Sequence, residues 1–207
     1  MSEDLFRRRP ELRACAEQME AAREALVSVF ARGGKLLLCG NGGSAADCEH
    51  VAGELLKGFE RERWLQDDLR ARLRAQGPEG EQLAARLQRA LPALSLTTHI
   101  SFATAFANDV APHLVFAQLV QALGRSGDGL LAITTSGNSE NVVLAARTAR
   151  AMGITVVGLT GGDGGELAPL CDVCLIAPGH GTAEIQEGHQ AIYHQLCREL
   201  ENCFFSD

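Results

Sequence analysis

The last predicted helix of the chain carries polar side chains that a helix closing a hydrophobic core would not need. Residues 185–197 read IQEGHQAIYHQLC, with Gln186 and His194 among apolar residues. Far upstream, His50 and Glu54 have the i, i+4 spacing that puts two side chains on one face of a helix. A carboxylate and an imidazole held close together can remove and return protons on a substrate. We therefore expect these two segments to form walls of one catalytic cleft.

A glycine-rich loop joins a predicted strand to the segment that carries His50. It reads GNGGS, and its candidate ligand-binding residues are Asn41, Gly42, Gly43 and Ser44. Glycines permit positive φ and a close approach of a ligand to the backbone, and Ser44 can cap the helix or turn its hydroxyl to a ligand. The loop is neither a Walker A sequence nor G-x-G-x-x-G, so no nucleotide cofactor is expected. By itself it also fits a plain strand-to-helix turn.

A second loop, ITTSGNSENV over residues 133–142, again joins a predicted strand to a helix. It places four hydroxyls around Gly137, namely those of Thr134, Thr135, Ser136 and Ser139. A helix N-terminus offers free amide donors and a partial positive charge, so it binds a phosphate without a lysine. A capping loop needs only one hydroxyl. Four of them predict a phosphate site.

The composition fits one compact domain. The chain has 207 residues, of which 46% are apolar and 22% charged, enough for one sizeable core but not for two ordinary domains. The net charge of −7 makes a nucleic-acid partner unexpected. No window approaches the roughly 18 consecutive apolar residues of a membrane helix, and the first residues lack the apolar segment of a secretory signal. We therefore expect a cytoplasmic protein with no membrane partner.

Cys171 and Cys174 form a C-x-x-C sequence, a pattern also found in zinc sites and redox pairs. No second C-x-x-C completes a zinc site, and the surrounding CDVCLIAP is typical of a buried strand. Because free cysteine is among the most buried residue types, we expect the seven cysteines to be reduced core thiols.

The predicted elements alternate between strands and helices. Apolar runs predict five strands at residues 35–39, 92–97, 129–135, 154–160 and 173–177, and helical patterns occur at 11–31, 44–57, 99–107, 111–123, 139–152 and 182–204. Continuous apolar strands separated by helices indicate a parallel sheet covered on both faces. Right-handed crossovers then give a three-layer αβα sandwich, a doubly wound, flavodoxin-like α/β domain. Ligands of such sheets bind beyond the carboxyl ends of the strands, where both polar loops lie.

Two helical regions lie outside this alternation. The N-terminal helix, residues 10–31, has an apolar face of Leu12, Cys15 and Met19 without an obvious partner, which favours a homo-oligomer. Residues 60–90 predict a charged helical hairpin with a Gly-Pro break. The arginines of its first half, at positions 61, 63, 70, 72 and 74, alternate with acidic residues, so a solvated or subunit-contacting hairpin is favoured over a polyanion site.

Three motifs, in this order, resemble those of the SIS (sugar isomerase) domain family: GNGGSAADxxHxxxE, TSGNS and IQExH followed by a second histidine. The resemblance runs from about residue 12 to residue 203, apart from the hairpin. Within the family the chain looks like the phosphoheptose isomerases, which convert sedoheptulose 7-phosphate to D-glycero-D-manno-heptose 7-phosphate. It implies an aldose–ketose isomerase of a phosphorylated sugar that works through an enediol, and a homotetramer with active sites at subunit interfaces.

The resemblance also implies residue roles. Glu54 and His194 match the catalytic acid/base pair. The phosphate is held by Ser44, Thr134, Thr135, Ser136 and Ser139, and the sugar by Asn41 and Asp109. In some members zinc is bound at the positions of His50, Glu54, Gln186 and His194, and Gln186 also belongs to the substrate-binding set. One Zn²⁺ per subunit and a metal-free site both stay open, because glutamine is an uncommon zinc ligand.

Two other functions also stay open. The SIS family includes non-catalytic modules, among them a replication-initiation regulator and sugar-phosphate-sensing domains. In the regulator the positions that match Glu54 and His194 are not acid/base residues, so their presence here favours an enzyme. The loops indicate phosphate better than sugar length, so an isomerase of a different phosphosugar is the second alternative.

Overall fold

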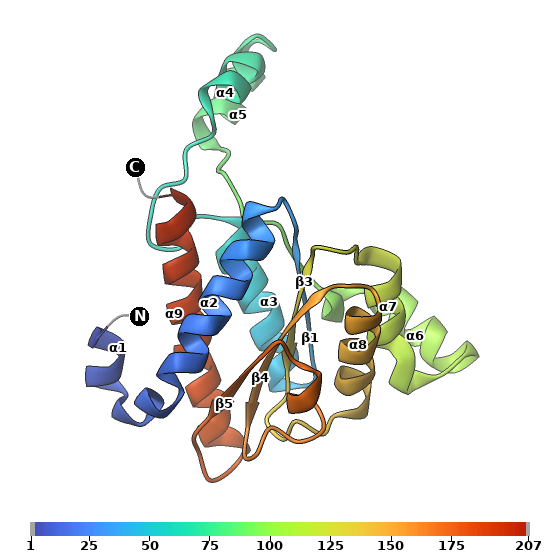
Figure 1. Ribbon diagram of the computed structural model, residues 1–207. Helices are drawn as coiled ribbons and strands as arrows, with labels where there is room; N and C mark the ends of the chain where they lie inside the picture. The colour runs from blue at the N-terminus through green and yellow to red at the C-terminus, as the bar shows by residue number, and fades with distance from the viewer. Residues whose placement is uncertain (1–2, 206–207) are drawn as a thin grey trace.

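The computed structural model describes residues 3–205 and contains one sheet of five parallel strands (Figure 1). The strands are β1 (Leu36–Gly40), β2 (Ala93–Ser95), β3 (Gly129–Ile133), β4 (Thr155–Gly161) and β5 (Val173–Ala177). Their order, β2-β1-β3-β4-β5, is the predicted doubly wound, flavodoxin-like order. β2 is shorter than predicted because the Ser95 hydroxyl accepts a hydrogen bond from the amide of Thr97, where the chain turns into the 3₁₀ helix η2 (Leu96–Thr98).

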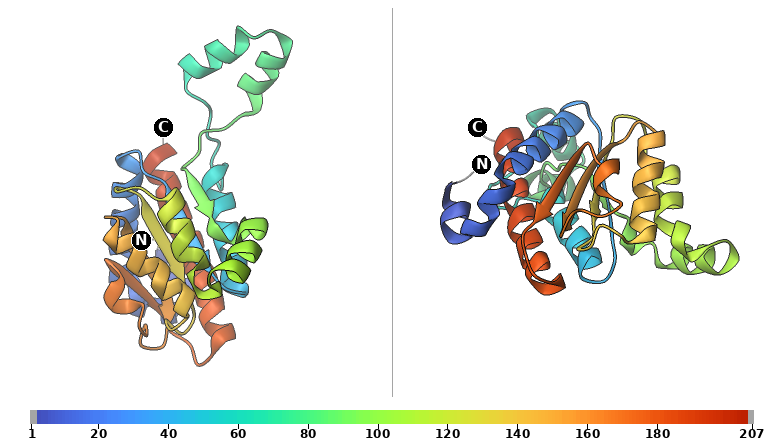
Figure 2. Two further views of the ribbon diagram at one scale, coloured as in Figure 1. Left: turned by 90° about the vertical axis from the view of Figure 1, so that its right-hand side faces the viewer. Right: turned by 60° about the horizontal axis from the view of Figure 1, so that its bottom comes forward.

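Helices cover both faces of the sheet, which confirms the three-layer sandwich (Figure 2). One layer contains α2 (Ala16–Ala31), α3 (Gly43–Leu56) and α9 (Thr182–Phe205), and the other contains α6 (Ile100–Asp109), α7 (Val115–Leu123) and α8 (Glu140–Ala151). Alternate strand residues serve the two layers: Leu36 and Leu38 pack with the first, and Leu37 and Cys39 with the second. The 3₁₀ helices η3 (Pro112–Leu114) and η4 (Ala168–Leu170) precede α7 and β5. Within residues 3–205, no helix is long and apolar enough to cross a membrane.

The N-terminal region is not the single helix predicted for residues 10–31. It consists of α1 (Glu3–Arg8), the 3₁₀ helix η1 (Pro10–Cys15) and α2. Leu12, Cys15 and Met19 are all buried in the core cluster that includes strand residues and α9. The expectation that this apolar face lacks a partner is therefore wrong, because η1 and α2 pack on β5 and α9 of the same chain.

The cysteines are only partly core residues. All seven are free, and Cys15, Cys39, Cys48 and Cys197 are buried. Cys171 and Cys174 are half-buried, and Cys203 is exposed near the end of α9. The expectation of core thiols is thus wrong for Cys203, because the last turns of α9 leave that side of the helix uncovered.

A helical hairpin projects from the body of the domain (Figure 1, Figure 2). Its helices are α4 (Asp67–Arg74) and α5 (Pro78–Arg86), and Gly77, with φ +90°, turns the chain between them. An isolated antiparallel bridge between Trp64 and Gln88 closes its neck. The helical prediction is wrong for residues 60–66, which are irregular and include Arg63, a buried side chain rather than a solvated one.

Candidate active site

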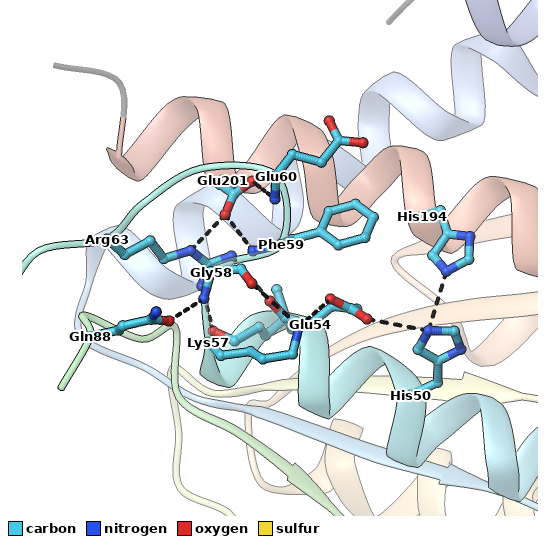
Figure 3. A network of polar contacts seen from close by, with 11 residues as sticks. His50, Glu54, Lys57, Gly58, Phe59, Glu60, Arg63, Gln88, His194 and Glu201 are labelled. Carbon is cyan, nitrogen blue, oxygen red and sulfur yellow. Dashed lines mark hydrogen bonds and ion pairs between the residues drawn. The ribbon is translucent and has the colours of Figure 1, made fainter. Parts of the chain in front are cut away.

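Two helices of the first layer bring together the side chains of His50, Glu54 and His194 (Figure 3). α3 and α9 pack on each other, and His50 and Glu54 share one face of α3, as their spacing predicts. The Nε2 atoms of His50 and His194 are 3.4 Å apart, and Nε2 of His50 lies 3.3 Å from Oε1 of Glu54. The predicted acid/base pair and a third predicted metal ligand therefore occupy one site.

Neighbouring groups set the charges of this cluster. The Glu54 side chain is only 14% exposed, and its Oε2 pairs with Nζ of Lys57 at 3.0 Å. Desolvation, followed by the nearby His50, lowers the pKa of His194. The ring of Phe59 stacks on His194 with centroids 5.7 Å apart. A neutral imidazole beside an ion-paired carboxylate can exchange protons with a substrate near neutral pH.

Two residues for which the sequence motifs predicted no role, Asp47 of the first motif and Tyr193, lie behind His50. The hydroxyl of Tyr193 donates to Oδ1 of Asp47 at 3.2 Å and lies 3.1 Å from Nδ1 of His50. Desolvation, and then the charge of Asp47, raises the pKa of Tyr193, so this residue stays a phenol. Asp47 precedes His50 by three residues and Glu54 by seven, which is the spacing of one helix face and the signal that could have identified it.

The glycine loop after β1 brings α3 close to α9. Gly42 has φ +55°, and a Cβ on Gly43 would collide with the side-chain amide of Gln186. Position 42 therefore needs glycine for its backbone conformation, whereas a side chain on Gly43 would require the flexible end of Gln186 to move. Ser44 is buried as the second residue of α3, so it is not the helix cap.

The loop after β3 holds the predicted hydroxyl cluster at the start of α8. The hydroxyls of Thr134 and Ser139 are hydrogen-bonded at 2.9 Å. Ser139 is the N-cap residue, but its side chain caps no helix amide. Ser136 is exposed, and its hydroxyl accepts from the amide of Asn138 at 3.2 Å, while Thr135 is half-buried beside it. The Ser139 hydroxyl therefore makes no capping hydrogen bond to α8, and a phosphate site requires a hydroxyl that is free of such a bond.

The two loops meet where the strand order reverses. β1 has β2 on one side and β3 on the other, so the loops after β1 and β3 flank the crevice in which doubly wound folds bind ligands. Asn41 and Asn141 join the loops, since each side-chain amide donates to the carbonyl oxygen of the other at 2.9 Å. This pair fixes the distance between the two candidate phosphate-binding segments.

The segment between β4 and η4 supports the hydroxyl loop from behind. Gly137, with φ +69°, lies so close to the carbonyl of Gly164 that no side chain fits there. Its own carbonyl accepts from the amide of Leu167 at 3.0 Å, and Oδ1 of Asn138 accepts from the amide of Glu166 at 3.0 Å. The shape of the loop is therefore set by tertiary contacts as well as by α8.

Two predicted site residues stand apart from the histidine cluster. Asp109 ends α6, on the opposite side of the molecule from α9, and accepts from the side chain of Asn108 at 2.8 Å (Figure 1). Among the described residues, no hydrogen bond joins Gln186 to the cluster. Instead, Gln186 lines a cavity of about 270 Å³ together with Gly43, Asp47, Ala183, Glu187 and Gln190. A second cavity, of about 410 Å³, lies beside His194 and is lined also by Phe59, Gln190, Arg198 and residues of α1.

A buried ion pair fastens the neck of the hairpin to both helices of the site (Figure 3). Nε of Arg63 donates to Oε1 of Glu201 on α9 at 2.8 Å. The other two guanidinium nitrogens donate to the carbonyls of Leu55 and Glu54, at 2.8 and 3.0 Å, near the end of α3. Glu201 also accepts two backbone amides of the neck, each at 2.8 Å. Burial alone would raise the pKa of Glu201, but these amides and Arg63 together hold it below its ordinary value.

The chain is similar to known proteins over most of its length. The sequence profile of the SIS domain matches residues 8–86 and 80–161. The phosphoheptose isomerase of Roseiflexus sp. (strain RS-1) is 43% identical over 192 residues, which are 93% of this chain and 85% of that protein. The solved phosphoheptose isomerase structures from Francisella tularensis and Neisseria gonorrhoeae are each 34% identical, with TM-scores of 0.77 and 0.76. The alignments cover 97% and 96% of this chain and 94% of each of those chains.

Proposed function

This chain belongs to the SIS domain family and, within it, to the phosphoheptose isomerases, and on that premise we propose that it isomerises sedoheptulose 7-phosphate to D-glycero-D-manno-heptose 7-phosphate. The observation that carries the proposal is the meeting of His50, Glu54 and His194 on the two helices that also border the glycine loop. An acid/base cluster next to two phosphate-type loops is what a sugar-phosphate isomerase requires.

The reaction moves one proton between neighbouring carbons. In the proposed mechanism the carboxylate of Glu54 removes a proton from C1 of the ketose and returns it to C2 of the enediol intermediate. His194, whose lowered pKa favours the neutral imidazole, accepts the proton of the C1 hydroxyl and gives a proton to the C2 oxygen. The aldehyde then forms at C1, and no proton is gained or lost overall.

The phosphate of the substrate is assigned to the loops after β1 and β3. Ser139 and Thr134 offer hydroxyls at the start of α8, where the helix dipole favours an anion. Replacing both Ser136 and Ser139 with alanine should raise KM strongly for the phosphorylated sugar. An unchanged KM in this double variant would remove the phosphate assignment.

We also propose that the site binds one Zn²⁺ through His50, Glu54, His194 and Gln186. Imidazole and carboxylate groups are ligands that zinc takes, and here Nε2 of His50 lies 3.4 Å from Nε2 of His194 and 3.3 Å from Oε1 of Glu54. Within residues 3–205, no three His, Cys, Asp or Glu side chains are arranged as a finished metal site. Side-chain rotation is therefore part of the proposal, with Gln186 turning away from Gly43. Zinc at this point would polarise the substrate carbonyl as a Lewis acid.

The oligomeric state and the cellular location of the protein are also proposals. Asp109 lies far from α9, so a neighbouring subunit is the proposed source of this side chain in a homotetramer of the kind found in the family. A cytoplasmic location is proposed because all seven cysteines are free, as a reducing compartment favours.

Turnover in deuterated water, followed by NMR, tests the enzyme. Wild type should incorporate deuterium into sedoheptulose 7-phosphate. Glu54→Gln and His194→Asn should each lower kcat at least ~10²-fold, and the two losses should not add, because the groups act as one unit. Glu62→Gln is the matched control, since this carboxylate is exposed on the hairpin neck. No exchange in wild type with any ketose phosphate, with or without zinc, would leave the non-catalytic module as the better function.

A further inference from the structure

The contacts behind His50 form a chain of hydrogen bonds with a fixed direction. Nδ1 of His50 faces the hydroxyl of Tyr193 at 3.1 Å, and that hydroxyl faces Oδ1 of Asp47 at 3.2 Å. Asp47 and His50 come from α3 and Tyr193 from α9, so the chain links the two helices of the site. Nε2, the other nitrogen of His50, is the atom that faces Glu54 and His194.

The number of available protons determines which group donates in each of these hydrogen bonds. An ionised Asp47 can only accept, so the single phenol proton of Tyr193 goes to Asp47. The phenol oxygen is then an acceptor for His50, which places the imidazole proton on Nδ1. We propose that Asp47 and Tyr193 are positioning residues that hold His50 in its Nδ1-protonated tautomer, so that the Nε2 lone pair faces the catalytic cluster.

The tautomer decides what the cluster can do. A proton on Nε2 of His50 would be donated to Oε1 of Glu54, only 3.3 Å away, and would tie up the catalytic carboxylate. With the proton on Nδ1, three acceptors or metal ligands converge instead: Nε2 of His50, the Glu54 carboxylate and His194. Such a site has acceptors but no donor between them, and it therefore favours the binding of a cation or of a substrate hydroxyl. A histidine that binds a metal through one nitrogen commonly donates its other N–H to an oxygen acceptor.

The second oxygen of Asp47 supports a role beyond stability. Oδ2 is buried and, among the described residues, has no hydrogen-bond partner. Leaving a buried acceptor unpaired costs stability, and such groups in folded proteins are explained by a bound water or ion or by a role in chemistry. Asp47 also lines the cavity shared with Gly43 and Gln186. A carboxylate that only closed the α3–α9 packing would be expected to have both oxygens satisfied.

The ¹⁵N chemical shifts of the His50 ring in metal-free protein, at a pH where the ring is neutral, report the tautomer directly. Wild type should have the proton on Nδ1. Tyr193→Phe removes the acceptor, and Asp47→Ala frees the phenol proton to be donated to Nδ1, so both variants should move the His50 proton to Nε2. Cys197→Ala is the matched control: it removes one buried heavy atom one turn further along α9 and should leave the tautomer unchanged.

Zinc titration gives a second readout. This readout rests on the proposed function, because it assumes that the site binds zinc, whereas the NMR readout does not. Loss of the link to His50 should weaken zinc binding about 10–100-fold in Tyr193→Phe, and in Cys197→Ala much less. Wild type with the proton on Nε2, a tautomer unchanged in both variants, or the same shift in Cys197→Ala would each overturn the positioning role. If wild type bound no zinc and catalysed no exchange, the proposed function would fail while the tautomer result still decided the role of Asp47 and Tyr193.

Discussion

Replacing Arg63 should test whether the buried ion pair holds α3 and α9, the two helices of the candidate site, in place. Arg63 is 1% exposed, and its partner Glu201 is also 1% exposed. Arg63→Met leaves the Glu201 carboxylate buried without its cation, and removing one partner of a buried pair costs about 3–5 kcal/mol of unfolding free energy. The same change frees two carbonyls near the end of α3, one of which belongs to Glu54, the proposed catalytic base.

Two further variants separate the contributions to this loss. Arg63→Lys keeps the charge, but one ammonium cannot reach Glu201 and both helix carbonyls, so we expect a loss of about 2–3 kcal/mol from the missing charge-assisted hydrogen bonds. Combining Arg63→Met with Glu201→Gln removes the unpaired charge and should recover a large part of the Arg63→Met loss. The expected order of stability is therefore wild type, then Arg63→Lys, then Arg63→Met.

Urea unfolding followed by circular dichroism, at one fixed protein concentration, measures these differences. The control is Arg72→Met in the hairpin, whose side chain is 70% exposed and pairs with Asp68 at 3.1 Å. Exposed pairs contribute at most about 1 kcal/mol, so this variant should be nearly as stable as wild type. An Arg63→Met variant within 1 kcal/mol of Arg72→Met, or a double variant less stable than Arg63→Met, would refute the reasoning.

Four more outcomes follow from other contacts. The folded-state pKa of Glu201 lies below its unfolded value of about 4.3, so its contribution to stability is present above that pH and is lost as pH falls through the folded pKa. When the unfolding free energy is measured at decreasing pH, Arg63→Met should therefore lose less stability than wild type. The pH profile of kcat/KM should fall on the acid side with an apparent pKa below the ordinary histidine value of about 6.5, and an acid-side fall with an apparent pKa well above that value would contradict the neutral form of His194. Gly137→Ala should destabilise the protein by more than 1 kcal/mol in urea unfolding, because its Cβ would meet the carbonyl of Gly164 at positive φ. Replacing residues 67–86 with a short glycine–serine linker should shift the thermal midpoint by less than about 4 °C, because α4 and α5 pack on each other, and a larger shift would show that the hairpin supports the body.

Local patterns in the sequence were sufficient for the layout of the fold and for half of the site. Apolar runs separated by helical patterns predicted five parallel strands, and the structure confirms them in the doubly wound order. The i, i+4 spacing of His50 and Glu54 predicted one shared helix face, and they are 3.3 Å apart. These features depend on the period of a helix or strand and on the strand-to-helix turns, all of which are encoded within a few residues.

Contacts between residues distant in the chain were decided only by the tertiary structure. The pattern of Arg63 among acidic neighbours is typical of a solvated helix, and its burial depends on Glu201, 138 residues later. Leu12, Cys15 and Met19 presented an apolar face whose partner, the sheet edge and α9, no local period identifies. The link from Asp47 through Tyr193 to His50 likewise exists only because α3 and α9 pack together. A sequence determines which side chains share a face of a helix. Which buried charges and hydroxyls meet depends on how the helices pack, because the energy of an ion pair or a hydrogen bond between distant residues is gained only once both groups are desolvated together.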